Sequence, residues 1–302
     1  MCLGGGLPSR LSDGVSRLAA LGAALCFVAG CVGAGRVAPA SSFAQLEPEE
    51  AVELGSSAVG VCRDGDGFLV LENSGTRIVR YGFRDSALGT VPMQGQPPFA
   101  LTVLDTLPLT ERMTAAAGIA ADRFYVYVFD DRALYRMSKE KLSLEPWLGN
   151  VRVVGLASFE PGIMLVSEEG RGSIWYKGLF GESRRFISGA EVARPGAMAA
   201  LGSGAFVVLS GTERLVYFNR SGVVQRMVSI PAGCDLLAYD DKGVLCIGQR
   251  GRPQVWVLRD GHLTGLRLPD SVSPLSLAVV GGRLVVLDAG TRLGVYRLPD
   301  ER

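Results

Sequence analysis

The sequence predicts an all-β fold, a six-bladed β-propeller in which every blade is a sheet of four short strands. An apolar run, a short polar turn and a second apolar run recur six times within the 302 residues. The first apolar residues of successive copies are separated by 56, 39, 43, 38 and 40 residues. Four of these five intervals match the blade period of about 40 residues.

Each copy is predicted to be the central hairpin of a blade. The copies are GFLVLENSGTRIVRYG (67–82), FYVYVFDDRALYRM (124–137), IMLVSEEGRGSIWYKG (163–178), FVVLSGTERLVYFNRSG (206–222), VLCIGQRGRPQVWVLRDG (244–261) and LVVLDAGTRLGVYRLPD (284–300). A short apolar segment precedes each hairpin, such as AVGVC (58–62) or VVGLA (153–157), and a more polar run follows, such as SRRFI (183–187). Because one such sheet cannot bury both of its faces alone, we expect six of them to pack around an axis.

The N-terminal segment is predicted to be a targeting signal. Arg10 and Arg17 precede an apolar stretch over 18–30 that is too short to span a bilayer. It ends in VAGC (28–31), which resembles the lipobox of bacterial lipoproteins; an ordinary secretory signal and an uncleaved anchor are the alternatives. The resemblance implies a signal peptide over 1–30, a lipid, including palmitate, on Cys31, and a tether over 31–41. Val32 follows this cysteine without an aspartate, which favours the outer membrane, on its periplasmic side or at the cell surface.

The propeller is predicted to occupy residues 42–302, with its ring closed by an N-terminal strand. The sixth copy runs to the end of the sequence without a fourth strand of its own. We expect SSFAQLEP (41–48) to supply this outer strand, since closure removes an open sheet edge.

The long first interval predicts an insertion of about 16 residues within 86–113. We expect part of it to be the outer strand of the first blade. The remainder is expected in the loop to the next inner strand, on the face that carries the turns between second and third strands. It either covers its own blade or forms one wall of a binding surface. The candidate binding residues in and beside it are Gln94, Pro97, Pro98, Phe99, Glu111 and Arg112.

A charged pair recurs in the hairpin turns. An acid ends the second strand at Glu72, Asp130, Glu168 and Asp288, and an arginine precedes the third strand at Arg77, Arg132, Arg171, Arg214, Arg252 and Arg292. The structural interpretation is that carboxylates accept hydrogen bonds from turn amides while arginines bridge neighbouring turns. The functional interpretation is a ring of arginines that receives an anionic ligand or partner. Recurrence in every unit favours the structural interpretation.

The composition limits the kinds of partner and site that the sequence predicts. A net charge of +1 gives no indication of a nucleic-acid partner. The only histidine, His262, is expected in a turn, and no catalytic residue, metal site or cofactor is predicted. Cys62 and Cys246 are expected to be buried free thiols. For Cys246 the alternative is a disulfide bond with Cys234.

The hairpins VLENSGTRIVRY (70–81) and VLDAGTRLGVY (286–296) resemble the NHL repeat of six-bladed propellers. This resemblance implies the fold and leaves the function open, because propellers host unrelated activities. We expect a monomeric, non-catalytic scaffold that binds another envelope or extracellular protein, or a ligand, while its N-terminal lipid holds it on the membrane. The alternative is an enzyme of lactonase or sugar-hydrolysing type that acts in the central channel.

Overall fold

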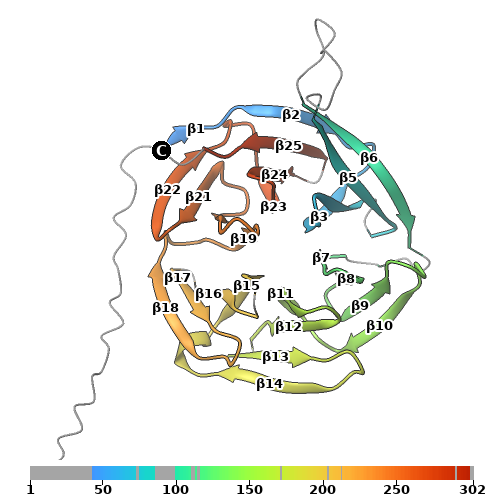
Figure 1. Ribbon diagram of the computed structural model, residues 1–302, viewed down its shortest axis with the longest axis vertical. Coiled ribbons are helices and arrows are strands. Elements are labelled where there is room, and N and C mark those ends of the chain that lie inside the picture. The colour runs from blue at the N-terminus through green and yellow to red at the C-terminus, as the bar shows by residue number, and fades with distance from the viewer. Residues whose placement is uncertain are drawn as a thin grey trace, which may run out of the picture. The chain divides into compact units, whose positions relative to one another are not determined.

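The computed structural model describes residues 43–299, apart from 73–74, 86–98, 110–112, 114–115, 171, 203, 212 and 290. The described residues form six sheets arranged around one axis (Figure 1), and the predicted six-bladed propeller is thereby confirmed. A single turn of 3-10 helix, η1 (Ala190–Val192), is the only helix among them. No helix in this part of the chain is long and apolar enough to cross a membrane.

Each of the first four blades has four strands in the order of the sequence, from the axis outwards. Blade one contains β3 (Ala58–Asp64), β4 (Gly67–Glu72), β5 (Arg77–Asp85) and β6 (Phe99–Pro108). Blade two contains β7 (Gly118–Ala121), β8 (Tyr125–Phe129), β9 (Ala133–Ser138) and β10 (Leu144–Gly149). Blade three contains β11 (Val153–Glu160), β12 (Ile163–Glu168), β13 (Ser173–Lys177) and β14 (Ser183–Ser188). Blade four contains β15 (Pro195–Ala200), β16 (Phe206–Ser210), β17 (Arg214–Phe218) and β18 (Val224–Ser229).

Blades five and six recruit strands from the N-terminal segment. Blade five contains β19 (Leu236–Tyr239), β20 (Leu245–Gly248), β21 (Gln254–Arg259) and β22 (His262–Arg267), and the short β1 (Ala44–Gln45) pairs in parallel with β22. Blade six contains β23 (Pro274–Val280), β24 (Arg283–Asp288) and β25 (Arg292–Arg297), and its outer strand is β2 (Pro48–Glu53). The N-terminal segment therefore closes the ring, as predicted.

The closing strand starts later than expected, and assigning it to 41–48 was wrong except for Pro48. The reason lies in the apolar residues that precede it. The Phe43 ring packs edge-on against Trp256 at 6.0 Å, in space left by Gly265, where a Cβ would lie 2.7 Å from that ring. Leu46 is buried between blades five and six. These contacts place 43–46 on blade five and leave 48–53 to pair with β25.

The core consists of six apolar clusters, one between each pair of neighbouring blades. The second strands supply most of it because both of their faces are covered. In β4, Phe68 and Val70 pack towards blade six, whereas Leu69 and Leu71 pack towards blade two. Each large apolar side chain buried in this way contributes about 1.5–3 kcal/mol. This explains why the second strands read as unbroken apolar runs in the sequence.

The two faces of the ring follow from the antiparallel order of the strands. We call the face with the turns between first and second, and between third and fourth, strands the bottom face. The top face carries the turns between second and third strands and the connections from blade to blade. The three described cysteines are free thiols, so the alternative bridge between Cys234 and Cys246 is absent. The predicted signal peptide over 1–30, the lipidated Cys31 and the tether over 31–41 lie outside the described residues.

Candidate functional site

A narrow channel runs along the propeller axis between the six inner strands. It has a volume of about 270 Å³ and is lined mainly by small or apolar side chains, including Val61, Ala120, Ala157, Ala199 and Val279. Charged residues gather where it opens. The candidate site therefore consists of the channel and its two mouths.

The top mouth is a cavity of about 520 Å³ with paired charges. Arg152 forms an ion pair with Glu169, and Arg250 lies 3.5 Å from Asp235. The Asp235 carboxylate also accepts a hydrogen bond of 2.7 Å from the backbone N–H of Arg250. Each of these acids thus has a cation beside it.

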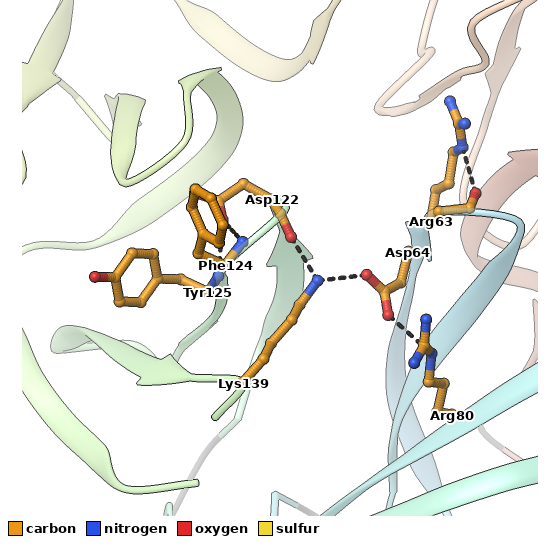
Figure 2. Close-up of polar contacts among 8 residues, drawn as sticks. Arg63, Asp64, Arg80, Asp122, Phe124, Tyr125 and Lys139 are labelled. Atoms are coloured by element: carbon orange, nitrogen blue, oxygen red, sulfur yellow. Dashed lines mark hydrogen bonds and ion pairs between the residues drawn. The ribbon is translucent and has the colours of Figure 1, made fainter. Parts of the chain in front are cut away.

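The bottom mouth is the larger cavity, at about 730 Å³, and contains a charge network that joins blades one and two. Asp64 ends β3 and is only 8% exposed. Its carboxylate accepts hydrogen bonds from Lys139 Nζ and lies 3.0 Å from Arg80 Nε. Lys139 also donates to the backbone carbonyl of Asp122, so Figure 2 shows the ammonium between Asp64 and Asp122. Two cations compensate the buried Asp64 charge, as such a charge requires.

Asp122 organises the neighbouring turn and ties it to blade three. Its Oδ1 accepts hydrogen bonds of 2.7 Å from the backbone N–H groups of Phe124 and Tyr125. Its Oδ2 accepts from the Tyr127 hydroxyl at 2.9 Å and from the Gly162 N–H at 2.6 Å. Burial raises the pKa of Tyr127, and the Asp122 charge raises it further. This carboxylate therefore works as an acceptor that fixes the turn geometry.

A further contact crosses the bottom mouth between non-adjacent blades. Arg63 at the end of β3 forms an ion pair with Asp241, in the turn that follows β19, and its Nε donates to the Gly65 carbonyl at 3.0 Å. Both Arg63 and Asp241 line the cavity. The pair links blade one to blade five past the inner end of blade six.

Exposed apolar side chains stand in other turns of the bottom face, one beside the cavity-lining Arg123 and two in turns between third and fourth strands. Phe180 is 92% exposed, Val223 is 55% exposed and Phe124 is 48% exposed, and all three lie in bottom-face turns. The Arg123 guanidinium lies 5.3 Å from the centre of the Phe124 ring. The turn with Phe180 is held to blade two by a 3.0 Å hydrogen bond from Arg136 to the Leu179 carbonyl. These residues combine an apolar surface with a fixed backbone.

The acids and thiols of the described residues form no group of three or more His, Cys, Asp or Glu side chains suited to hold a metal ion. His262 is the exposed first residue of β22, in an outer strand rather than in the turn expected for it. Burial raises the pKa of the Cys234 thiol to about 12, and the nearby Asp235 charge adds to this effect. Asp64, Asp122 and Asp241 do converge on the bottom mouth, and each already has donors or a cation from the protein.

The structure divides the predicted insertion. Asp85 pairs with Phe99, so β5 and β6 form one long hairpin, and 86–98 joins third strand to fourth strand. The expected position between an outer strand and the next inner strand was therefore wrong for this part. FALTVL belongs to the outer strand β6, and the described residues that flank 86–98, Asp85 and Phe99, lie at the bottom ends of their strands.

The candidate binding residues predicted in and beside the insertion therefore fall into two groups, one before β6 and at its start and one after its end. Phe99 begins β6, whereas Gln94, Pro97 and Pro98 belong to 86–98 and lie outside the described residues. Glu111 and Arg112 follow the other end of β6 and also lie outside them. The chain order places these two groups at opposite ends of one strand.

The turn arginines that the structure describes lie on the top face, and none of them lines its mouth. Arg77 is bound to Glu72, with Nη2 at 2.6 Å from Oε2, and Arg292 lies 3.6 Å from Glu53. Arg132 is 86% exposed along its side chain. Arg214 and Arg252 are also exposed, and Arg171 lies outside the described residues.

Sequence reasoning missed the bottom mouth. Its signal is an aspartate at the turn after an inner strand, which recurs as Asp64, Asp122 and Asp240. Lys139 pairs with Asp64, 75 positions away in the sequence, and Arg63 pairs with Asp241, 178 positions away. Such long-range contacts have no local pattern.

Comparisons with known proteins support the fold alone. No protein-family model and no curated protein matches the chain. Among solved structures, a streptogramin B lyase has a TM-score of 0.54 and 10% identity, covering 83% of this chain and 87% of that one. The WD40 propeller domain of Doa1 has a TM-score of 0.59 and 11% identity, with coverage of 84% and 98%. YCF48 bound to D1 peptide has a TM-score of 0.55 and 12% identity, with coverage of 87% and 99%. These likenesses show that the chain has the architecture of a β-propeller.

Proposed function

We propose that this protein is a non-catalytic binding module whose bottom face recognises another protein of the cell envelope. The observation that carries the proposal is that exposed Phe124, Phe180 and Val223 share the bottom face with a charged cavity of about 730 Å³. Aromatic residues and arginines dominate the energetics of protein interfaces, and the cavity offers a place for a side chain of the partner.

The rigidity of this face supports the proposal. Contacts between blades fix its turns, through Lys139 with Asp64, Arg136 with the Leu179 carbonyl, and Arg220 with Glu160. A surface that is already ordered loses less conformational entropy on binding, so more of the contact energy contributes to affinity. The charged groups at the mouth then select partners by electrostatic complementarity.

One solved structure of similar fold is described as bound to a peptide. Its identity of 12% transfers no residue to this chain, but it shows a propeller of comparable length in a binding role. The NHL-like hairpins over 70–81 and 286–296 imply the fold and are compatible with a binding module and with an enzyme alike.

The proposal includes a membrane anchor, a lipid on Cys31, and the lipobox-like VAGC (28–31) supports it. Palmitate labelling of the wild type and of Cys31→Ser tests the anchor. The proposal expects label on the wild type only; equal labelling of both chains would remove the anchor.

Co-purification from crosslinked membranes tests the binding role. The variant Phe180→Asp places a charge at the most exposed apolar position, and Arg214→Asp is a matched change at an exposed top-face position. We expect Phe180→Asp to reduce the yield of a specific partner at least tenfold while Arg214→Asp leaves it unchanged. Equal yields from both variants and the wild type would refute binding through this face.

The enzyme alternative draws on the three carboxylates at the bottom mouth, Asp64, Asp122 and Asp241. A lactonase-type reaction there would depend on one of them as the acid or base. Turnover of a panel of lactones and glycosides that is lost in Asp241→Asn, the most exposed of the three, would favour the enzyme over the binding module.

A further inference from the structure

The charges that line the bottom mouth indicate what kind of side chain a partner inserts there. The cavity of about 730 Å³ is lined by four cations, Arg63, Arg80, Arg123 and Lys139, and by three acids, Asp64, Asp122 and Asp241. The lining residues therefore carry an excess of one positive charge. The contacts of each acid show on which side of the mouth this excess lies.

Two of the three acids form no ion pair with the cations of blades one and two. The Asp122 carboxylate accepts hydrogen bonds from three backbone N–H groups and one tyrosine hydroxyl, all of them neutral donors. Lys139 donates to the backbone carbonyl of Asp122 rather than to its carboxylate. Asp241 is paired with Arg63 at the other side of the mouth.

Asp64 is the only acid that pairs with the lining cations of blades one and two within the described part of the chain. Figure 2 shows its buried carboxylate between Lys139, to which it is bonded, and Arg80, whose Nε lies 3.0 Å away. One negative charge thus faces two cations. The Arg80 side chain is 45% exposed, and its Nε supplies only one of the five N–H donors of the guanidinium.

Arg123 lines the same side of the cavity and has no acid beside it. It is exposed in the turn between β7 and β8. Its guanidinium lies 5.3 Å from the centre of the Phe124 ring and forms no ion pair with a carboxylate of the described residues. Stacking on the ring restricts the guanidinium in advance, so pairing with a carboxylate costs less conformational entropy.

We propose that the bottom mouth binds an acidic side chain of the partner, a glutamate or an aspartate, which pairs with Arg123 and is attracted by the cations around Asp64. This inference rests on the proposed function, because it names the chemistry of the partner that the bottom face recognises. A planar guanidinium binds both oxygens of a carboxylate at once, and the excess of one positive charge matches one carboxylate. Ala121, Ala200 and Leu201 supply an apolar wall for the methylene groups of that side chain.

Two short peptides, hexaglutamate and hexaglutamine, test the preference for acid on the purified full-length chain. Both are acetylated, amidated and labelled with the same dye, and binding is measured by fluorescence anisotropy. We expect hexaglutamate to bind, with an affinity that falls as salt is raised, and hexaglutamine to bind far more weakly.

Variants of Arg123 assign this binding to the bottom mouth. Arg123→Gln leaves the contacts of Asp64 intact and should weaken hexaglutamate binding about tenfold, whereas Arg123→Lys keeps the charge and should retain most of the affinity. Arg214→Gln, at an exposed position of the top face, is the matched control and should bind as the wild type does.

Charge reversal at the same position separates this inference from the proposed function. In the co-purification, Arg123→Glu should lower the yield of the partner roughly tenfold or more, as Phe180→Asp does. Loss with Phe180→Asp but not with Arg123→Glu would leave the bottom-face function standing and overturn the acidic partner. Loss with Arg123→Glu alone would support the acidic partner and refute the apolar contact. The inference is also overturned if hexaglutamate binds no more tightly than hexaglutamine, or if Arg123→Gln and Arg214→Gln bind it equally.

Discussion

Replacing Glu72 by alanine tests whether the recurring turn pair is structural. Glu72 is 2% exposed and accepts hydrogen bonds from Arg77 Nη2 at 2.6 Å, from the Tyr81 hydroxyl at 3.1 Å and from Ser56 Oγ at 3.3 Å. Ser56 lies in the connection from the closing strand β2 to β3. The carboxylate thus joins the first hairpin to the segment that closes the ring.

The expected loss follows from these partners. Hydrogen bonds to a charged group contribute about 1.5–3 kcal/mol, but the Arg77 side chain is 42% exposed and regains water, which lowers its share. Tyr81 is 6% exposed, and a buried hydroxyl left unpaired costs about 1–3 kcal/mol. We therefore expect Glu72→Ala to lower the free energy of unfolding by about 2–4 kcal/mol.

Urea denaturation monitored by tryptophan fluorescence provides the measurement. Asp131→Ala is the control, because Asp131 occupies an exposed position in the equivalent turn of blade two, 3.9 Å from Arg132. Its expected effect is within about 0.5 kcal/mol. Burial, with a smaller contribution from the Glu72 charge, raises the pKa of Tyr81, so Glu72→Ala should also lower that pKa. The reasoning is refuted if both alanine variants are equally stable.

Three further predictions concern packing, the mouth and the thiols. Gly155→Val should prevent folding, because a Cβ there would lie 2.2 Å from a backbone carbonyl of blade four, whereas Gly149→Val, with open space, should fold as judged by circular dichroism. Lys139→Met should lower the free energy of unfolding, measured in urea, by about 2 kcal/mol, because Asp64 loses one of its two cations. Adding Asp64→Asn to this variant should restore part of the lost stability, because the uncompensated charge is removed. If the losses of the two single variants simply add in the double variant, Lys139 and Asp64 do not interact as an ion pair. Burial keeps the Cys234 thiol neutral in the fold and raises its pKa to about 12, while the unfolded chain ionises from its ordinary value of 9.0. The contribution of the neutral Cys234 thiol to the free energy of unfolding is complete below pH 9 and declines above it by roughly 1.4 kcal/mol per pH unit. Cys234→Ala should therefore make the free energy of unfolding, measured in urea, fall less steeply between pH 9 and 10.5. An unchanged slope would contradict this.

The fold was predictable because its strongest signals are local. The run FLVL (68–71) is apolar at every position because neighbouring blades cover both faces of β4, and this pattern recurs at each second strand. The register of the closing strand was less accessible. In the sequence, Phe43 and Leu46 look like residues of the closing strand. In the structure Phe43 packs against Trp256 of blade five, and Leu46 is buried between blades five and six.

The site was harder to predict for the same physical reason. Phe99 and its apolar neighbours resembled an inserted loop, because nothing in the sequence shows that β5 extends far enough to pair with them. Asp64 and Lys139 meet only after two blades pack side by side, and Arg63 meets Asp241 only after the ring closes. Contacts created by closure cannot be read from a single repeat.

Position-dependent photocrosslinking in cells measures the central claim most directly. A photoreactive side chain is placed at Phe180 on the bottom face, or at Arg214 on the top face, of the full-length chain. A binding module that uses its bottom face should give one discrete adduct from position 180 and none from position 214. An adduct from position 214 alone, or the same adducts from both positions, would contradict the assignment of the bottom face.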